Sequence, residues 1–235
     1  YRMLGDFERA DSLLVRALGQ RRALFGESHA DVAASLVALS ELRIEQAELA
    51  EAEQLARAAL DMARRTLPPH DPRIGAAAAT LGQVLQARAE YAAAIPLLEE
   101  AIAREGDRPS AQLAGLVSTL AATHYFAGNY AASDSLNRRS QALHTALFGE
   151  RHPSVADDLM NLGAVRSDQG LYDEAEQLYR QALDIKLAYH GEEHHRTAAS
   201  RTVLGRVLVA QGRLDEALEQ LAPALQTRER VFGSV

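Results

Sequence analysis

Apolar residues recur three and four positions apart along the chain, with polar residues between them. In the stretch 147–190, Val155, Leu159 and Leu162 follow this spacing and therefore share one face of a helix. A second amphipathic stretch begins after Gly170, and glycine readily takes the left-handed conformation that ends a helix. The pattern predicts two amphipathic helices joined by a tight turn.

The rest of the chain repeats this pattern with edited copies, most of them 42 residues apart. A leucine followed by a small residue marks each copy: Leu39, Leu81, Leu120, Leu162 and Leu204. Two series of small residues keep the same register. The first is Ala10, Ala52, Ala94, Ser133, Ala175 and Ala217, and the second is Ala17, Ala59, Ala101, Ser140, Ala182 and Ala224. A larger side chain at these positions would force paired helices apart, so we predict that they are packing positions.

Each copy also carries signals for where its helices begin and end. First helices are predicted to begin at a proline that follows Asp71 or His152, and Pro109 is a variant of that signal. They are predicted to end at a glycine or its substitute: Gly5, Ala47, Ala89, Gly128, Gly170 and Gly212. We therefore expect an all-α chain of eleven helices in a single array over 1–235. Its half repeat is 1–28, and its full repeats are 29–69, 70–107, 108–151, 152–193 and 194–235.

Composition narrows the class of function. The formal charge of −7 is spread along the chain, whereas nucleic-acid binding needs a clustered basic face. No apolar run approaches the roughly 20 residues that span a bilayer, so we expect no membrane segment. Cysteine is absent, which removes disulfides and thiolate chemistry and is compatible with a reducing compartment. We expect a cytoplasmic protein without cofactor or metal.

The residues in these registers resemble a known family. The leucine-small pair, the turn glycine, the aromatic and the alanine of HPSVADDLMNLGAVRSDQGLYDEAEQLYRQALDIK are similar to the tetratricopeptide repeat. The 42-residue period resembles the longer subtype of kinesin light chains and many bacterial proteins. Ala89, Ser133 and Ser140 depart from the family pattern. The resemblance implies a right-handed solenoid of about five and a half repeats that binds proteins and performs no catalysis. It also implies the interaction arm of a larger signalling or regulatory protein, of which this chain would be a fragment.

In the family, side chains of the first helices line a concave groove that binds a peptide or a helix of a partner. Counting from each leucine, the resemblance places in the groove Val37, Glu41, Ile44, Gln83, Thr119, Tyr125, Phe126, Met160, Asn161, Asp168, Thr202 and Arg206. Tyr125 and Phe126 are the only adjacent aromatics among them and are candidates to anchor the partner. Asn161 is a candidate to hold a peptide backbone, because an amide both donates and accepts hydrogen bonds. Acidic residues outnumber Arg206, which favours a neutral or weakly basic peptide.

Two alternatives remain open. Neither end of the chain has a visibly polar capping helix, so the array could instead mediate self-association as a homo-oligomer. HGEEHH at 190–195 resembles a metal cluster and would suggest a metal-dependent enzyme. However, FGESH at 25–29 and FGERH at 148–152 share its register, so one of its histidines is a repeated connector position. No catalytic residue is nominated, because no nucleophile-base order or phosphate-binding glycine loop stands out.

Overall fold

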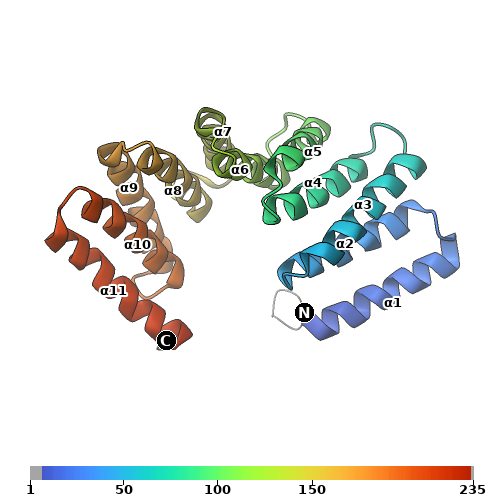
Figure 1. Ribbon diagram of the computed structural model, residues 1–235, viewed down its shortest axis with the longest axis horizontal. Coiled ribbons are helices and arrows are strands. Elements are labelled where there is room, and N and C mark those ends of the chain that lie inside the picture. Colours follow the sequence, from blue (N-terminus) through green and yellow to red (C-terminus); the bar gives the residue numbers. More distant parts are fainter. Residues whose placement is uncertain (1–6, 234–235) are drawn as a thin grey trace. The chain divides into compact units, whose positions relative to one another are not determined.

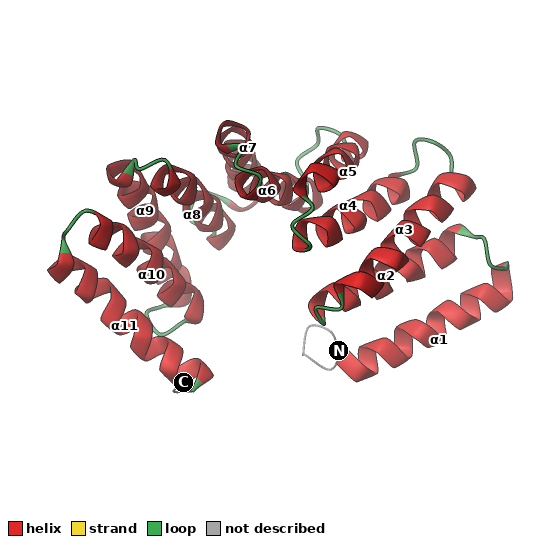
Figure 2. Ribbon diagram, in the orientation of Figure 1, coloured by secondary structure: helices red, strands yellow, loops and turns green. Residues whose placement is uncertain are grey.

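The computed structural model describes residues 7–233, and within that range every regular element is an α-helix (Figures 1 and 2). Eleven helices are present in the described part, as the sequence predicts. The expected turn at Gly5 lies outside the described residues.

The described chain separates into two compact units, one of residues 7–108 and 126–128 and the other of 109–125 and 129–233. The first unit contains α1 (Phe7–Phe25), α2 (Ala30–Glu45), α3 (Leu49–Thr66), α4 (Pro72–Ala87) and α5 (Tyr91–Glu105). The second contains most of α6 (Ala111–Phe126), then α7 (Tyr130–Phe148), α8 (Pro153–Asp168), α9 (Tyr172–His190), α10 (His195–Ala210) and α11 (Leu214–Phe232). Each of the five predicted full repeats therefore holds two helices.

The first helix of most repeats begins at a capping side chain. Asp71 accepts a hydrogen bond from the backbone N–H of Arg73 at 2.9 Å, which satisfies one of the free donors of α4. In the same register, Nδ1 of a histidine accepts the equivalent bond at 3.2 Å in α2, α8 and α10. These histidines are His29, His152 and His194. The connector histidines are thus helix caps, a role that the sequence pattern alone did not indicate.

The start of α6 corrects one expectation. Pro109 does not open this helix, which begins at Ala111. The hydroxyl of Ser110 accepts a hydrogen bond from the backbone N–H of Leu113 at 3.0 Å. A serine cap satisfies the helix terminus directly after the proline, and α6 therefore starts later than predicted.

The predicted turn positions adopt left-handed backbone conformations. Gly128, Gly170 and Gly212 have φ between 76° and 78°, while Ala47 and Ala89 have φ of 60° and 61°. In this conformation the Cβ of an L-residue crowds the backbone, which costs roughly 1–2 kcal/mol. The two alanine turns are therefore strained versions of the glycine turns.

Replacing Ala47 or Ala89 with glycine should stabilise the first unit. Each change removes the left-handed penalty but increases the entropy of the unfolded chain, so we expect a net gain of about 0.5–1 kcal/mol per site. Urea denaturation would measure the change in the free energy of unfolding. Ala93→Gly, at an exposed position inside α5, is the matched control and should destabilise. Destabilisation by Ala47→Gly would contradict the assignment.

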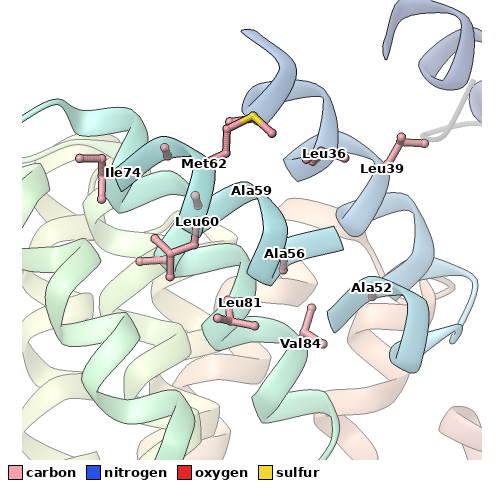
Figure 3. Close-up of a cluster of buried hydrophobic side chains, with 14 of the residues drawn as sticks. Leu36, Leu39, Ala52, Ala56, Ala59, Leu60, Met62, Ile74, Leu81 and Val84 are labelled. Carbon is pink, nitrogen blue, oxygen red and sulfur yellow. The ribbon is translucent and has the colours of Figure 1, made fainter. Parts of the chain in front are cut away.

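The core of the first unit lies between α2, α3 and α4, whose apolar side chains point toward one another (Figure 3). Ala52 and Ala59 of α3 are fully buried there, as the packing series predicts. Leu36, Leu60 and Leu81 come from the three different helices and are also buried. The small residues of α3 let the neighbouring helices approach closely, and the leucines fill the remaining space.

In the second unit, α8, α9 and α10 pack through a buried aromatic. Tyr179 of α9 is 4% exposed and lies in one cluster with Leu204 and Val207 of α10. Its ring also lies against Gly163 of α8, where a Cβ atom would meet the ring at 2.6 Å. The small residue after the repeat leucine is therefore required for this ring to fit.

Ion pairs join successive repeats through an acidic residue that keeps one register, while the position of its arginine partner varies. The residue after the first packing alanine of a second helix is usually acidic and pairs with an arginine of the following repeat. These pairs are Asp11–Arg43 at 2.7 Å, Glu53–Arg88 at 2.7 Å, Asp134–Arg166 at 2.5 Å and Glu176–Arg213 at 2.6 Å. In α5 and α11 the same register holds Ile95 and Leu218. Because the pairs are partly exposed, each contributes roughly 1 kcal/mol or less.

Candidate functional site

A cavity of about 490 Å³ opens in the second unit between α8, α9 and α10, with one side chain from α6. Its lining residues are Tyr125, Ala164, Ser167, Asp168, Tyr172, Tyr179, Val203, Arg206, Val207 and Ala210. We call it the Tyr179 cavity. It combines three phenols, one carboxylate and one guanidinium with small apolar side chains, a mixture typical of a recognition site.

Tyr125 and Asp168 are held together at one side of the Tyr179 cavity. The Tyr125 hydroxyl donates a hydrogen bond to Oδ2 of Asp168 at 2.6 Å. Burial raises the pKa of Tyr125, and the bond to the carboxylate raises it further. Tyr125 therefore remains a protonated donor at neutral pH and orients the Asp168 carboxylate.

Arg206 also lines the cavity and is exposed. Burial raises the pKa of Tyr179 to about 12; Asp168 adds to the rise and Arg206 opposes it. Both charges therefore act on the Tyr179 phenol. Among the residues that the structure describes, Arg206 forms neither an ion pair nor a hydrogen bond, so its guanidinium is available to a ligand.

The structure brings three of the predicted groove residues, Tyr125, Asp168 and Arg206, into one cavity. It adds Tyr172 and Tyr179, which were not predicted because the expected groove was built from the first helices alone. The sequence does contain one indication that Tyr179 lies near the first helix of its repeat. A ring four residues after Ala175 faces the glycine that follows Leu162.

The other predicted groove residues are not gathered in the Tyr179 cavity. Tyr125 and Phe126 have different neighbours, because the Phe126 ring stacks on Tyr91 with centroids 5.9 Å apart. Met160 packs between helices and accepts a hydrogen bond from Ser200 at 3.2 Å. Half-buried positions elsewhere are Val37, Glu41, Ile44, Gln83, Thr119, Asn161 and Thr202. Of these, Val37 lines a smaller, alanine-rich cavity of about 100 Å³ between α2 and α4.

Comparison with known families decides what kind of chain this is. A family model described as tetratricopeptide repeat matches residues 1–65, 112–188 and 159–230, and a second model of the same description matches 75–104. The chain belongs to the tetratricopeptide repeat family. No curated protein matches the sequence.

Solved structures show the same tetratricopeptide solenoid. BtubC (BKLC) from P. vanneervenii is 20% identical with a TM-score of 0.80, and the match covers 98% of this chain and 94% of that one. A putative kinesin light chain from Podosopora anserina with nearly identical repeats is 22% identical with a TM-score of 0.72, covering 85% and 96%. YrrB, a tetratricopeptide repeat protein with an unusual peptide-binding site, is 16% identical with a TM-score of 0.57, covering 92% and 94%. At these identities the likeness concerns the fold.

In this tetratricopeptide chain, the histidine rings at 190–195 lie against one another, and two of them are stacked. The rings of His190 and His194 are 4.2 Å apart and nearly parallel, at 7°, and His195 follows at 4.3 Å. Stacked imidazoles direct their nitrogens along separate planes and do not converge on one ion. Within 7–233, no group of three or more histidine, cysteine or acidic side chains is placed to hold a metal. The metal-enzyme alternative therefore has no support from this geometry.

The cap at His194 makes the stability of α10 pH-dependent. Burial lowers the pKa of His194, and the positive neighbours His195, Arg196 and Lys186 lower it further. Between the folded-state pKa and the unfolded value of about 6.5, the folded protein binds fewer protons than the unfolded chain. The stability that the His194 cap contributes is therefore fully present above about pH 6.5 and is lost as the pH falls through the folded-state pKa.

We expect His194→Asn to weaken this pH dependence, because asparagine caps a helix without titrating. Urea denaturation between about pH 7.5 and pH 5 would show a smaller loss of stability for the variant than for the unsubstituted protein. Equal losses in the two proteins would contradict the assignment.

The packing serine at position 140 belongs to a buried polar network. Ser140 Oγ donates to Oδ1 of Asp158 at 2.7 Å, and Nδ1 of His144 lies 2.7 Å from Oδ2. Burial raises the pKa of Asp158, while His144 and Ser140 oppose that rise. The serine is fully buried and bonds the carboxylate, so these residues are no nucleophile-base system. The hydrogen bond from Ser140 to Asp158 explains why this copy has serine where the other copies have alanine.

Membrane insertion through a helix finds no support in the described range. Every helix of residues 7–233 is too short or too polar to cross a bilayer.

Proposed function

We propose that the chain is a protein-interaction module and that it holds a peptide segment of its partner in the Tyr179 cavity. The observation that carries this proposal is the pair of opposite charges, Asp168 and Arg206, that line one cavity without an ion pair between them. Phenols beside them offer flat, rigid contact area at low entropic cost. Family membership supports the same interpretation, as does the peptide-binding site of the solved relative YrrB.

A blocking substitution tests this function. Random peptides displayed on phage would be selected against the unsubstituted protein, and their affinities measured by fluorescence anisotropy. Ala164→Trp fills the Tyr179 cavity and should abolish binding of the selected peptides. Ala188→Trp, at an exposed position of α9, is the matched control and should not change it. A selection that returns no specific peptide, or peptides that bind Ala164→Trp equally well, would refute the proposal.

Self-association is a second candidate, favoured by the outer face of α11. Leu214, Leu218 and Leu225 are 59%, 63% and 59% exposed, and Leu218 stands where α1, α3, α7 and α9 carry the paired acid. An apolar stripe of this kind suits packing against a second copy. We expect the light-scattering mass to rise with concentration and to remain monomeric for Leu218→Glu/Leu225→Glu. A monomer at all concentrations for the unsubstituted protein would remove this candidate.

A further inference from the structure

The Tyr179 cavity is electrostatically two-sided. Asp168 is the last residue of α8, whereas Arg206 lies inside α10. Both residues are exposed and both line the cavity, yet no ion pair joins them among the described residues. Opposite charges that share a cavity and stay apart leave each available for a counter-charge from a ligand.

The acidic side is preorganised. Tyr125 occupies Oδ2 of Asp168, and its ring is in turn tilted against Tyr130, with centroids 5.9 Å apart. One carboxylate oxygen is thereby fixed. A positioned carboxylate binds a cation at a smaller entropic cost than a mobile one. Because Tyr125 donates a hydrogen bond and does not neutralise the group, the negative charge is kept.

The basic side differs in its surroundings. Arg206 is flanked by Val203, Val207 and Ala210 of its own helix, which offer no acceptor side chain. A planar guanidinium in such a setting suits a carboxylate, which it can bind through two parallel hydrogen bonds. Both charges act on the pKa of the Tyr179 phenol, which adds a neutral hydroxyl to the same cavity.

We infer that the ligand of the Tyr179 cavity is a dipolar peptide segment, with a cationic side chain against Asp168 and a carboxylate side chain against Arg206. This inference rests on the proposed function and adds the charges of the bound segment and the residue that each charge faces. A segment with one charge of each sign is neutral overall, so the inference refines the expectation of a neutral or weakly basic peptide. A segment in the reverse direction would place like charges together at both ends, and such juxtaposition is unfavourable.

The test uses short synthetic peptides, acetylated and amidated, with the same alanine and tyrosine frame. One set carries a lysine and a glutamate in both orders, and the others carry lysine or glutamate at both positions. Isothermal titration at low salt should give one lysine–glutamate order an affinity about tenfold above the reverse order and the like-charged peptides. Equal affinity of the two orders would overturn the inference.

Exchanging the charges of Asp168 and Arg206 in the protein is the decisive experiment. In Asp168→Arg/Arg206→Asp the preferred order should invert, after circular dichroism has confirmed helical folding. Arg206→Gln and Asp168→Asn offer a second route: each should abolish the preference at one end only. An unchanged order in all three variants would also overturn the inference. If phage-selected peptides remain sensitive to Ala164→Trp while no charge order is preferred, the proposed function stands and the dipolar ligand fails.

Discussion

Ser140→Ala should lower the free energy of unfolding by about 2 kcal/mol, although alanine is the residue that every other copy carries at this position. The reason is the buried carboxylate of Asp158, which loses a charge-assisted hydrogen bond from the serine. Asp158 is 1% exposed, so water does not replace the missing donor. A substitution toward the family pattern is therefore destabilising here.

A double-mutant cycle would isolate this effect. In the Asp158→Ala background the serine has no carboxylate to stabilise, so Ser140→Ala should cost much less. Ser135→Ala, on the exposed side of α7, is the matched control and should change stability by no more than about 0.5 kcal/mol. Additive costs in the cycle would show that Ser140 and Asp158 do not act together.

Gly163→Ala is the second substitution with a large expected effect. A single added methyl group would lie 2.6 Å from the Tyr179 ring, and that ring is buried and has little room to move. Such overpacking typically costs about 1–3 kcal/mol. Since Tyr179 also lines the proposed binding cavity, peptide affinity should fall together with stability.

A glycine-to-alanine substitution in α6 is expected to raise the free energy of unfolding, whereas Gly163→Ala in α8 should lower it. Gly115→Ala adds a methyl group that would meet no atom within 4 Å apart from the neighbouring backbone of its own helix. Alanine favours a helix over glycine by roughly 0.5–1 kcal/mol, so this control should stabilise. Thermal or urea denaturation of the two variants distinguishes a packing requirement from helix propensity. Stabilisation by Gly163→Ala would contradict the packing of Tyr179 against α8.

The fold was predictable because its constraints are local and repeated. A leucine-small pair, a turn glycine and two packing alanines have the same physical role in each copy, so their register alone indicated the helix pairs. Ala47 and Ala89 were recognised as turn positions although they lack the conformational freedom of glycine. The prediction from Pro109 was wrong because a proline signal and a serine cap lay next to each other, and the cap determined where α6 begins.

The site was predictable only in part. Tyr125, Asp168 and Arg206 follow from the register of the first helices, which repeats in every copy. Tyr179 belongs to a second helix, and its ring occupies the space that Gly163 of the first helix leaves open. Such a contact joins two helices, so it cannot be predicted from the repeat positions of one helix alone. The Ser140–Asp158 bond likewise joins two residues 18 positions apart. Ser140 alone suggests a defect in the repeat, and only its contact with Asp158 explains it.

The central claim is that the Tyr179 cavity binds a peptide. Chemical-shift mapping of isotope-labelled protein with a phage-selected peptide tests it most directly. We expect the largest shifts at the amides of Asp168, Tyr179 and Arg206, with a titration that saturates at equal amounts of peptide and protein. Shifts confined to other helices, or none at saturating peptide, would contradict the claim.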